Sequence, residues 1–349
     1  MCRKIYELEK FMKLNLKNQK QNLKNQKQKT LKEKAKSELI RNINKWVEED
    51  RFFDDITSNL LGLNKTKKRG KMVFFSKSKD DFVLAGADFI ETIFFKMQKK
   101  CNAHFKIKYY KKDGDIVRYG EKICQIHSDN IGLLLSLERI CLNLLCRLSA
   151  IATETYKLTK KAKKYGVRIL ATRKTTPGLR MLEKYAVAIG GGEPYRIDLS
   201  SSFMIKDNHI RAIGGTRELV NFFEKLEPKI KRKILKKGIT IEVQKEEELD
   251  SALKIAQILK KEIREKKGKE DVFNFTIMLD NFQPKTLRKL IRKIRNFSSS
   301  QKINISIELS GGIREHNIEK FLKLKPDAIS SSYITLSPPY FPDISADIL

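Results

Sequence analysis

Short apolar runs alternate with longer helical segments in the sequence after Gly166. Each run ends in polar residues, and helical stretches such as EEELDSALKIAQILKKEI lie between most of them. The runs are RILATRK (168–174), YAVAIGG (185–191), FMIKD (203–207), ITIEVQ (239–244), FTIMLDN (275–281), ISIELSGG (305–312) and DAISSS (327–332). Alternating strands and helices predict a parallel sheet, and seven or eight such units closing on themselves predict a barrel. Functional side chains of such barrels lie at the carboxyl ends of the strands.

A different pattern precedes residue 150. The segment IRNINKWVEEDRF has helical spacing, with Ile40, Ile43 and Trp46 on one face. Strand-like runs follow in KMVFFSKS, DDFVLAGADF and HFKIKYY, and GDIVRYGEKICQIHS is typical of two short strands joined by a turn. Apolar residues with a 3.6-residue period then predict a long helix from Leu133 toward Lys164, packed into a core.

These patterns divide the chain into three parts. Residues 1–35 are lysine-rich and contain LKNQKQN followed by LKNQKQK, which predicts a mobile or loosely helical tail. Two leucines over two heptads are too few for a coiled coil. Residues 36–149 are expected to form an α/β domain, with residues 336–349 packing back on it, and residues 150–335 the barrel.

The net charge of +31 allows two interpretations. A strongly basic chain is typical of nucleic-acid binding through phosphate contacts. The lysines are spread over every segment, however, and accompany heavy Ile and Asn usage, which favours a compositional bias. In either case the charge would help to attract a polyphosphate substrate.

The composition excludes several classes of protein. No apolar run approaches the roughly 18 residues that a membrane span needs, and the N-terminus lacks the apolar stretch of a secretory signal. Five cysteines without a CxxC pair argue against a disulfide framework, and four scattered histidines give no zinc spacing. We therefore expect a protein of the reducing cytoplasm.

Five of the six Lys and Arg residues in the segment from Thr172 to Ile210 stand at the ends of apolar runs, close to the glycines at 190–192. A lone Arg or Lys is usually a solvated surface charge. Repeated placement at strand ends instead predicts a shared cleft for a small molecule with several negative charges. The five are Arg173, Lys174, Arg180, Arg196 and Lys206.

Several motifs in this part of the chain resemble the signature of the quinolinate phosphoribosyltransferase family. They are TRKTTPGLR (172–180), the glycine run followed by an aromatic residue and Arg196, and IKDNHI (205–210). DDITS (54–58), VLAGADF (83–89), LERICLNLLCRLSAIAT (137–153), IMLDNF (277–282), LSGGI (309–313) and DISADIL (343–349) follow in the family's order. The resemblance covers roughly residues 36–349. It implies an α/β sandwich domain followed by an incomplete, about seven-stranded TIM-like α/β barrel.

The resemblance also implies an activity and its site residues. Quinolinate and phosphoribosyl pyrophosphate (PRPP) would give nicotinate mononucleotide, diphosphate and CO2 for NAD biosynthesis, with Mg²⁺ as cofactor. Arg139 would be supplied by another subunit, which requires at least a homodimer. The anionic groups would be bound by Arg139, Thr172, Arg173, Lys174, Tyr195, Arg196 and Lys206, with Lys174 also catalytic. Glu242 and Asp280 would be catalytic, contact the ribose and hold Mg²⁺.

Two strand ends are predicted to bind the 5′-phosphate through backbone N–H groups. They are Ser310-Gly311-Gly312, which we expect to open a helix, and Ser331-Ser332-Tyr333. Ser332 stands where the family often has glycine. Tyr195 replaces the family's usual histidine, and Glu242 is the only glutamate of a strand that usually carries two.

Two other functions remain as alternatives. One is a nicotinate phosphoribosyltransferase, although one carboxylate and PRPP need fewer cations than this chain supplies. The other is a basic nucleic-acid-binding protein with a relic barrel, which predicts broken catalytic positions.

Overall fold

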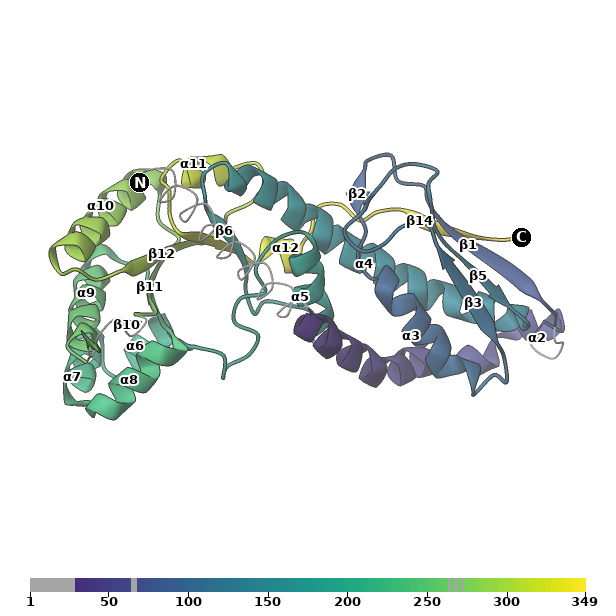
Figure 1. The fold of residues 1–349 in the computed structure, drawn as a ribbon, viewed down its shortest axis with the longest axis horizontal. Coiled ribbons are helices and arrows are strands. Elements are labelled where there is room, and N and C mark those ends of the chain that lie inside the picture. Colours follow the sequence, from purple (N-terminus) through teal and green to yellow (C-terminus); the bar gives the residue numbers. More distant parts are fainter. Residues whose placement is uncertain (1–28, 64–67, 263–264, 267–268, 271–272) are drawn as a thin grey trace, which may run out of the picture. The chain divides into compact units, whose positions relative to one another are not determined.

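The computed structural model describes residues 29–63, 68–262, 265–266, 269–270 and 273–349 (Figure 1). The chain divides into two units. The first contains the described residues up to Ala152 together with Thr176–Ile189 and Tyr340–Leu349, and the second contains the described residues of Thr153–Thr175 and Gly190–Pro339. The stretch Thr176–Ile189 therefore groups with the first unit, although its sequence position lies within the expected barrel.

An antiparallel sheet of four strands, in the order β14-β1-β5-β3, forms the first unit together with its helices. The strands are β1 (Gly70–Ser76), β3 (Phe105–Tyr109), β5 (Lys122–Ser128) and β14 (Ile344–Ile348), with a separate pair β2 (Phe82–Val83) and β4 (Ile116–Val117). The helices are η1 (Phe52–Asp54), α2 (Ile56–Leu60), α3 (Ala87–Gln98), α4 (Ile131–Lys163) and α5 (Arg180–Ile189). The last strand of the chain thus pairs with the first, from Met72 opposite Ile348 to Ser76 opposite Ile344.

A helix over residues 29–49 precedes these elements and corrects two expectations. Its buried apolar side chains follow a four-residue spacing, namely Leu31, Ala35, Leu39, Ile43 and Val47. Residues 29–35 therefore belong to a packed helix and not to a tail, because their apolar side chains are covered. Ile40, expected on the apolar face, is exposed. The rest of the predicted tail, residues 1–28, lies outside the described residues.

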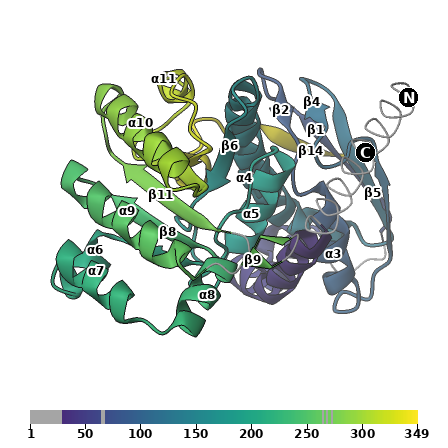
Figure 2. The same ribbon diagram turned by 60° about the vertical axis from the view of Figure 1, so that its left-hand side comes forward.

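Six parallel strands form the sheet of the second unit, in the order β6-β13-β12-β11-β8-β7. The strands are β6 (Arg168–Ala171), β7 (Phe203–Ile205), β8 (Ile239–Val243), β11 (Phe275–Asp280), β12 (Ile305–Ser310) and β13 (Ala328–Ser331), with a small antiparallel pair β9 (Glu265–Lys266) and β10 (Lys269–Glu270). The helices are α6 (Asp207–Ala212), α7 (Thr216–Lys225), α8 (Pro228–Lys237), α9 (Glu246–Lys260), α10 (Pro284–Ser300), α11 (Ile318–Leu322) and α12 (Tyr333–Leu336). Helices α9 and α10 cover the outer face of β8 and β11 (Figure 2).

This parallel sheet is the expected incomplete α/β barrel, with one strand fewer than expected. The run YAVAIGG was predicted as a strand, but most of it lies in α5. All residues from Leu182 to Val187 are buried, and a short, fully buried apolar run does not distinguish a helix from a strand by its periodicity. The chain after α5 returns to the sheet through an isolated parallel bridge between Glu193 and Leu170.

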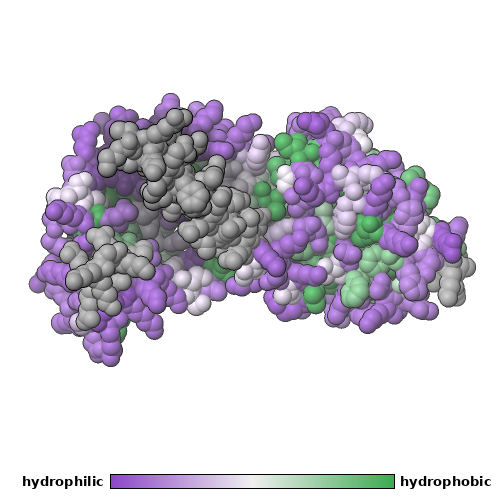
Figure 3. Space-filling model, in the orientation of Figure 1, coloured by the Kyte–Doolittle hydropathy of each residue, from purple (hydrophilic) through white to green (hydrophobic). Residues whose placement is uncertain are grey.

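Hydrophilic side chains dominate the face of the molecule in Figure 3, in keeping with charged residues making up 33% of the chain. Within the described ranges, none of the helices has the length and apolar character needed to cross a membrane. Cys101, Cys124, Cys141 and Cys146 are free thiols.

Candidate active site

A cavity of about 250 Å³ lies at the carboxyl ends of β6, β11, β12 and β13. It brings together nine of the residues that the sequence predicted to bind substrate: Thr172, Lys174, Asp280, Ser310, Gly311, Gly312, Ser331, Ser332 and Tyr333. Asn281 and Arg314, which the sequence reasoning missed, line it as well. The ends of these four strands therefore share one cavity, as barrel geometry requires, whereas Arg173, Arg196, Lys206 and Glu242 are not among its lining residues.

The glycine loop after β12 needs both of its glycines for conformational reasons. Gly311 and Gly312 have φ values of 95° and 61°. A Cβ atom on Gly311 would lie 2.2 Å from Asn281 Oδ1, whereas one on Gly312 would meet nothing within 4 Å. Asn281 has φ 62°, and its N–H donates to the carbonyl oxygen of Ser310 at 3.1 Å. The ends of β11 and β12 are thus locked together by backbone contact.

No helix opens directly at Ser310-Gly311-Gly312, so the expected helix N-terminus is wrong. Helix α11 begins only at Ile318 and is five residues long. The intervening loop is closed by Asn317, whose Oδ1 accepts from Arg314 N at 2.8 Å and whose Nδ2 donates to the Gly312 carbonyl at 2.9 Å. The loop can still offer backbone N–H groups to an anion, because positive φ values place successive amides on a concave surface.

Hydrogen bonds fix the backbone on the opposite wall of this cavity. Lys174 N donates to Thr172 Oγ1 at 3.1 Å, and the Lys174 carbonyl accepts from Thr335 Oγ1 at 2.7 Å. Ser331 Oγ donates to the Ile313 carbonyl at 2.7 Å. The Lys174 side chain is exposed while its backbone is held, so its ammonium group is available to a ligand.

The two predicted carboxylates lie on neighbouring strands and are linked through Gln244. Glu242 is 3% exposed, pairs with Lys206 Nζ, and accepts from Gln244 Nε2 at 2.8 Å. The same Nε2 atom lies 3.4 Å from Asp280 Oδ2. Thr240, Glu242 and Gln244 face one side of the sheet, as their alternation predicted. Lys206 was expected to bind a substrate carboxylate, but in this structure its charge is matched by Glu242.

Two arginines of the second unit lack a counter-ion of this kind. The Nε atoms of Arg173 and Arg196 are buried and have no hydrogen-bond partner within the described part of the chain. Burial lowers the pKa of the Arg196 guanidinium, and the nearby charge of Arg173 lowers it further. Arg196 also has φ 45° and places Nη1 3.0 Å from the sulfur of Met204. Two close, partly desolvated cations favour a ligand with two negative charges.

Tyr195, predicted as a substrate ligand, is an electrostatic neighbour of Arg196 but does not line the strand-end cavity. Its hydroxyl lies 2.9 Å from Thr240 Oγ1, and its ring lines a separate cavity of about 310 Å³ near the amino ends of the strands. The two cavities have no lining residue in common. Tyr195 faces the barrel interior because residue 193 is tied to β6, where Glu193 N donates to Ile169 O at 2.8 Å.

Arg139 belongs to the first unit and lies on α4. Its side chain is 64% exposed, and its Nη2 atom lies 3.7 Å from Oε1 of Glu138. This exposure leaves the guanidinium available for a contact outside its own unit.

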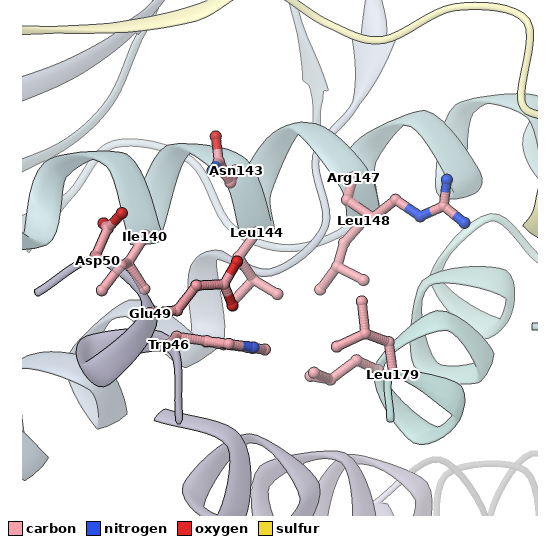
Figure 4. A pocket seen from close by; sticks show the side chains of 10 residues that line it. Trp46, Glu49, Asp50, Ile140, Asn143, Leu144, Arg147, Leu148 and Leu179 are labelled. Carbon is pink, nitrogen blue, oxygen red and sulfur yellow. The ribbon is translucent and has the colours of Figure 1, made fainter. Parts of the chain in front are cut away.

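The first unit has a cavity of its own, of about 230 Å³ (Figure 4). Leu144 and Leu148 of α4 point toward Trp46 and Leu179, and Arg147 points away from this group. Arg147 instead donates to Glu183 Oε1 at 2.7 Å. The walls are mainly apolar and include none of the predicted substrate-binding residues.

The described residues contain no group of three or more His, Cys, Asp or Glu side chains that could hold a metal ion by themselves. Mg²⁺ does not require such a group, because it usually takes one or two carboxylates together with substrate phosphates and water. Asp280 fits this role, since its hydrogen bonds from Gln244 and Asn281 both reach Oδ2. Glu242 fits less well because Lys206 and Gln244 bind its two oxygens.

An incomplete parallel α/β barrel with cations, carboxylates and a glycine loop at its strand ends is the framework of an enzyme that acts on phosphorylated, anionic small molecules. Family comparison makes this class specific. Residues 55–149 match the N-terminal domain of quinolinate phosphoribosyl transferase, and residues 151–346 match its C-terminal domain. The chain belongs to the quinolinate phosphoribosyl transferase family.

Individual relatives extend over almost the whole chain. A probable nicotinate-nucleotide pyrophosphorylase [carboxylating] of Methanocaldococcus jannaschii is 35% identical over 90% of this chain and 98% of its own length. A protein of the same description from Bacillus subtilis is 33% identical over 89% of this chain and 93% of its own length. The nicotinate-nucleotide pyrophosphorylase structure from Francisella tularensis has a TM-score of 0.71 at 27% identity, over 90% of this chain and 97% of that one.

Proposed function

We propose that this chain is a carboxylating phosphoribosyltransferase that converts quinolinate and PRPP into nicotinate mononucleotide, diphosphate and CO2, a step of NAD biosynthesis. The single observation that carries the substrate assignment is the pair of buried, unpartnered Nε atoms of Arg173 and Arg196. Quinolinate carries two neighbouring carboxylates, and a planar guanidinium donates two parallel hydrogen bonds to a carboxylate. One dicarboxylate therefore satisfies both arginines.

The reaction joins the ring nitrogen of quinolinate to C1 of PRPP while the bond from C1 to the diphosphate breaks. Positive charge develops on the ribose as diphosphate leaves, so the site has to stabilise opposite charges at once. Glu242 and Asp280 supply negative charge beside the ribose and can accept hydrogen bonds from its hydroxyls. Lys174 supplies positive charge toward the departing diphosphate. The carboxylate next to the ring nitrogen then leaves as CO2, and a proton from solvent replaces it on the ring carbon to complete the product.

The 5′-phosphate is assigned to the strand-end cavity of the second unit. The glycine loop and the residues after β13 present backbone N–H groups there. Mg²⁺, when bound with PRPP, would be held by Asp280 and would neutralise part of the diphosphate charge. Lys206 forms an ion pair with Glu242 and orients its carboxylate, which makes Lys206 a positioning residue in this proposal.

Quinolinate binding tests the assignment of the two arginines. Calorimetric titration of the wild-type chain should show tighter binding of quinolinate than of nicotinate, which has one carboxylate. Arg196→Met removes a charge-assisted pair, so we expect quinolinate binding to weaken about 10- to 150-fold and nicotinate binding to change less. Arg292→Met, on the exposed face of α10, removes the same charge elsewhere and serves as the control. Equal affinity for the two ligands would favour nicotinate phosphoribosyltransferase activity instead.

A homodimer in which Arg139 acts on the partner's site is a further part of the proposal. It is supported by the exposed position of Arg139 on α4. Arg139→Ala and Lys174→Ala should each abolish turnover. An equimolar mixture of the two variants that has exchanged subunits should regain about a quarter of wild-type activity, because about half of the dimers are mixed and each of those has one intact site of two. If the mixture recovers no activity although its dimers are shown to exchange subunits, Arg139 does not act on the partner's site.

A cytoplasmic location completes the proposal. The free thiols of the described cysteines suit a reducing compartment. Fractionation of cells that express the tagged chain would test it, and recovery with an oxidising compartment would oppose it.

A further inference from the structure

Arg314 is a cation at the phosphate cavity that the motifs of the sequence did not single out. Of the residues that line this cavity, Lys174 and Arg314 are the two cations, and Asp280 is the one anion. Lys174 comes from the end of β6, and Arg314 follows the glycine loop after β12. The cavity therefore has a positive group on each of two walls.

The structure holds the Arg314 side chain in place from two directions. Its backbone N–H is fixed by Asn317 Oδ1 at 2.8 Å, and Asn317 is itself bonded to the glycine loop. Its guanidinium carbon lies 4.8 Å from the centroid of the Tyr333 ring. Tyr333 N in turn donates to Ser331 Oγ at 3.3 Å. Because stacking uses the face of the guanidinium, its N–H groups stay available at the edge.

No carboxylate neutralises this guanidinium among the ion pairs of the described residues. The adjacent acid, Glu315, pairs with Lys161, at 3.1 Å between Oε1 and Nζ. Asp280 lines the same cavity but accepts hydrogen bonds from Gln244 and Asn281, and it forms no ion pair with Arg314. A cation that is oriented yet lacks a counter-ion is prepared for an anionic ligand.

We propose that Arg314, stacked on Tyr333, binds the 5′-phosphate of PRPP by bidentate hydrogen bonds. This inference rests on the proposed function and adds a residue to it. Backbone amides of the glycine loop direct hydrogen bonds to the phosphate but carry no net charge, whereas the phosphate is dianionic near neutral pH. Arg314 supplies the missing charge, and Tyr333 orients it. Discrimination for a phosphorylated ribose then depends on Arg314.

Two fragments of the substrate separate this role from a general effect of charge. Ribose 5-phosphate carries only the group assigned to Arg314, and inorganic diphosphate carries only the leaving group. In Arg314→Met, we expect the dissociation constant of ribose 5-phosphate and the KM for PRPP to rise about 10- to 100-fold. The dissociation constant of diphosphate and the KM for quinolinate should stay within a factor of about two, since the lost contact is a local one.

Three further variants sharpen the test. Arg314→Lys keeps the charge without the planar fork and should give an intermediate loss. Tyr333→Leu removes the stacking surface and should weaken ribose 5-phosphate binding in the wild-type background but add little in Arg314→Met. Arg292→Met should match the wild type, which controls for net charge.

Calorimetry with ribose 5-phosphate does not depend on turnover, so it separates the two proposals. Unchanged ribose 5-phosphate binding in folded Arg314→Met and Arg314→Lys overturns the role of Arg314. An equal loss for diphosphate overturns it as well, because the effect would then be general. Absence of product formation by the wild-type chain, with normal binding of ribose 5-phosphate, refutes the proposed function instead.

Discussion

Alanine substitutions at Gly311 and Gly312 form a matched pair that tests whether the glycine loop shapes the phosphate site. Both glycines have positive φ values, 95° and 61°, so either alanine strains the backbone by about 1–2 kcal/mol. They differ in the space available. The Cβ of Gly312→Ala meets nothing within 4 Å, whereas that of Gly311→Ala would lie 2.2 Å from Asn281 Oδ1 and 2.6 Å from Asn281 N.

The second clash cannot be relieved by rotating a side chain, because it includes a backbone atom. Asn281 N is bonded to the Ser310 carbonyl at 3.1 Å, so the ends of β11 and β12 have to separate. Such overpacking costs about 1–3 kcal/mol beyond the strain. If this cost falls on the phosphate-bound state, the KM for PRPP of Gly311→Ala should exceed that of Gly312→Ala about 5- to 150-fold.

Steady-state kinetics with PRPP as the varied substrate measure this ratio, with quinolinate saturating. The KM for quinolinate should be alike in both variants, and thermal unfolding should confirm that both are folded. Equal KM values for PRPP in the two folded variants would refute the idea that contact between the glycine loop and Asn281 shapes the site.

Three other outcomes follow from the geometry. Tyr195→Phe removes the bond to Thr240 Oγ1 that holds the residue next to Arg196 in the chain, so the KM for quinolinate should rise about three- to tenfold with kcat unchanged. Tyr156 of α4 is exposed and serves as the control, so Tyr156→Phe should leave both constants unchanged. Burial raises the pKa of Glu308 from 4.5 to about 6, so its ionisation costs stability as the pH rises through this range. The free energy of unfolding of Glu308→Gln, measured relative to that of the wild type, should therefore increase by about 2 kcal/mol between pH 4 and pH 7.5. Urea unfolding that gives the same difference between variant and wild type at both pH values would contradict this. Chelation with EDTA should abolish turnover but leave quinolinate binding, measured by calorimetry, intact, because arginines rather than Mg²⁺ hold the dicarboxylate. If EDTA abolished quinolinate binding as well as turnover, the arginines would not be sufficient to hold quinolinate.

The alternation of strand-like and helical segments predicted the parallel barrel. Most of the strands were easy to recognise because an apolar run is followed directly by polar residues. The run YAVAIGG was wrongly predicted as a strand, since five consecutive apolar residues fit a buried stretch of helix as well as a buried strand. The N-terminal helix was misjudged for a related reason. Its buried residues recur every four positions from Leu31 to Val47. The prediction considered only residues from Ile40 onward, where this spacing is harder to recognise, and it placed the exposed Ile40 on the buried face of the helix.

At the site, the sequence located the strand ends but not the partners of each side chain. Lys206 and Glu242 are 36 residues apart, and only folding shows that they neutralise each other. The direction of Tyr195 depends on the bridge between Glu193 and β6, which no local pattern encodes. Asn281 had a usable signal, since asparagine tolerates positive φ and follows Asp280 at a strand end.

Turnover with carboxyl-labelled quinolinate, PRPP and Mg²⁺ tests the central claim most directly. The wild-type chain should release labelled CO2 and form nicotinate mononucleotide in equal amounts, and nicotinate in place of quinolinate should give little product. Conversion of nicotinate without CO2 release, or no product from quinolinate in a folded protein, would contradict the account.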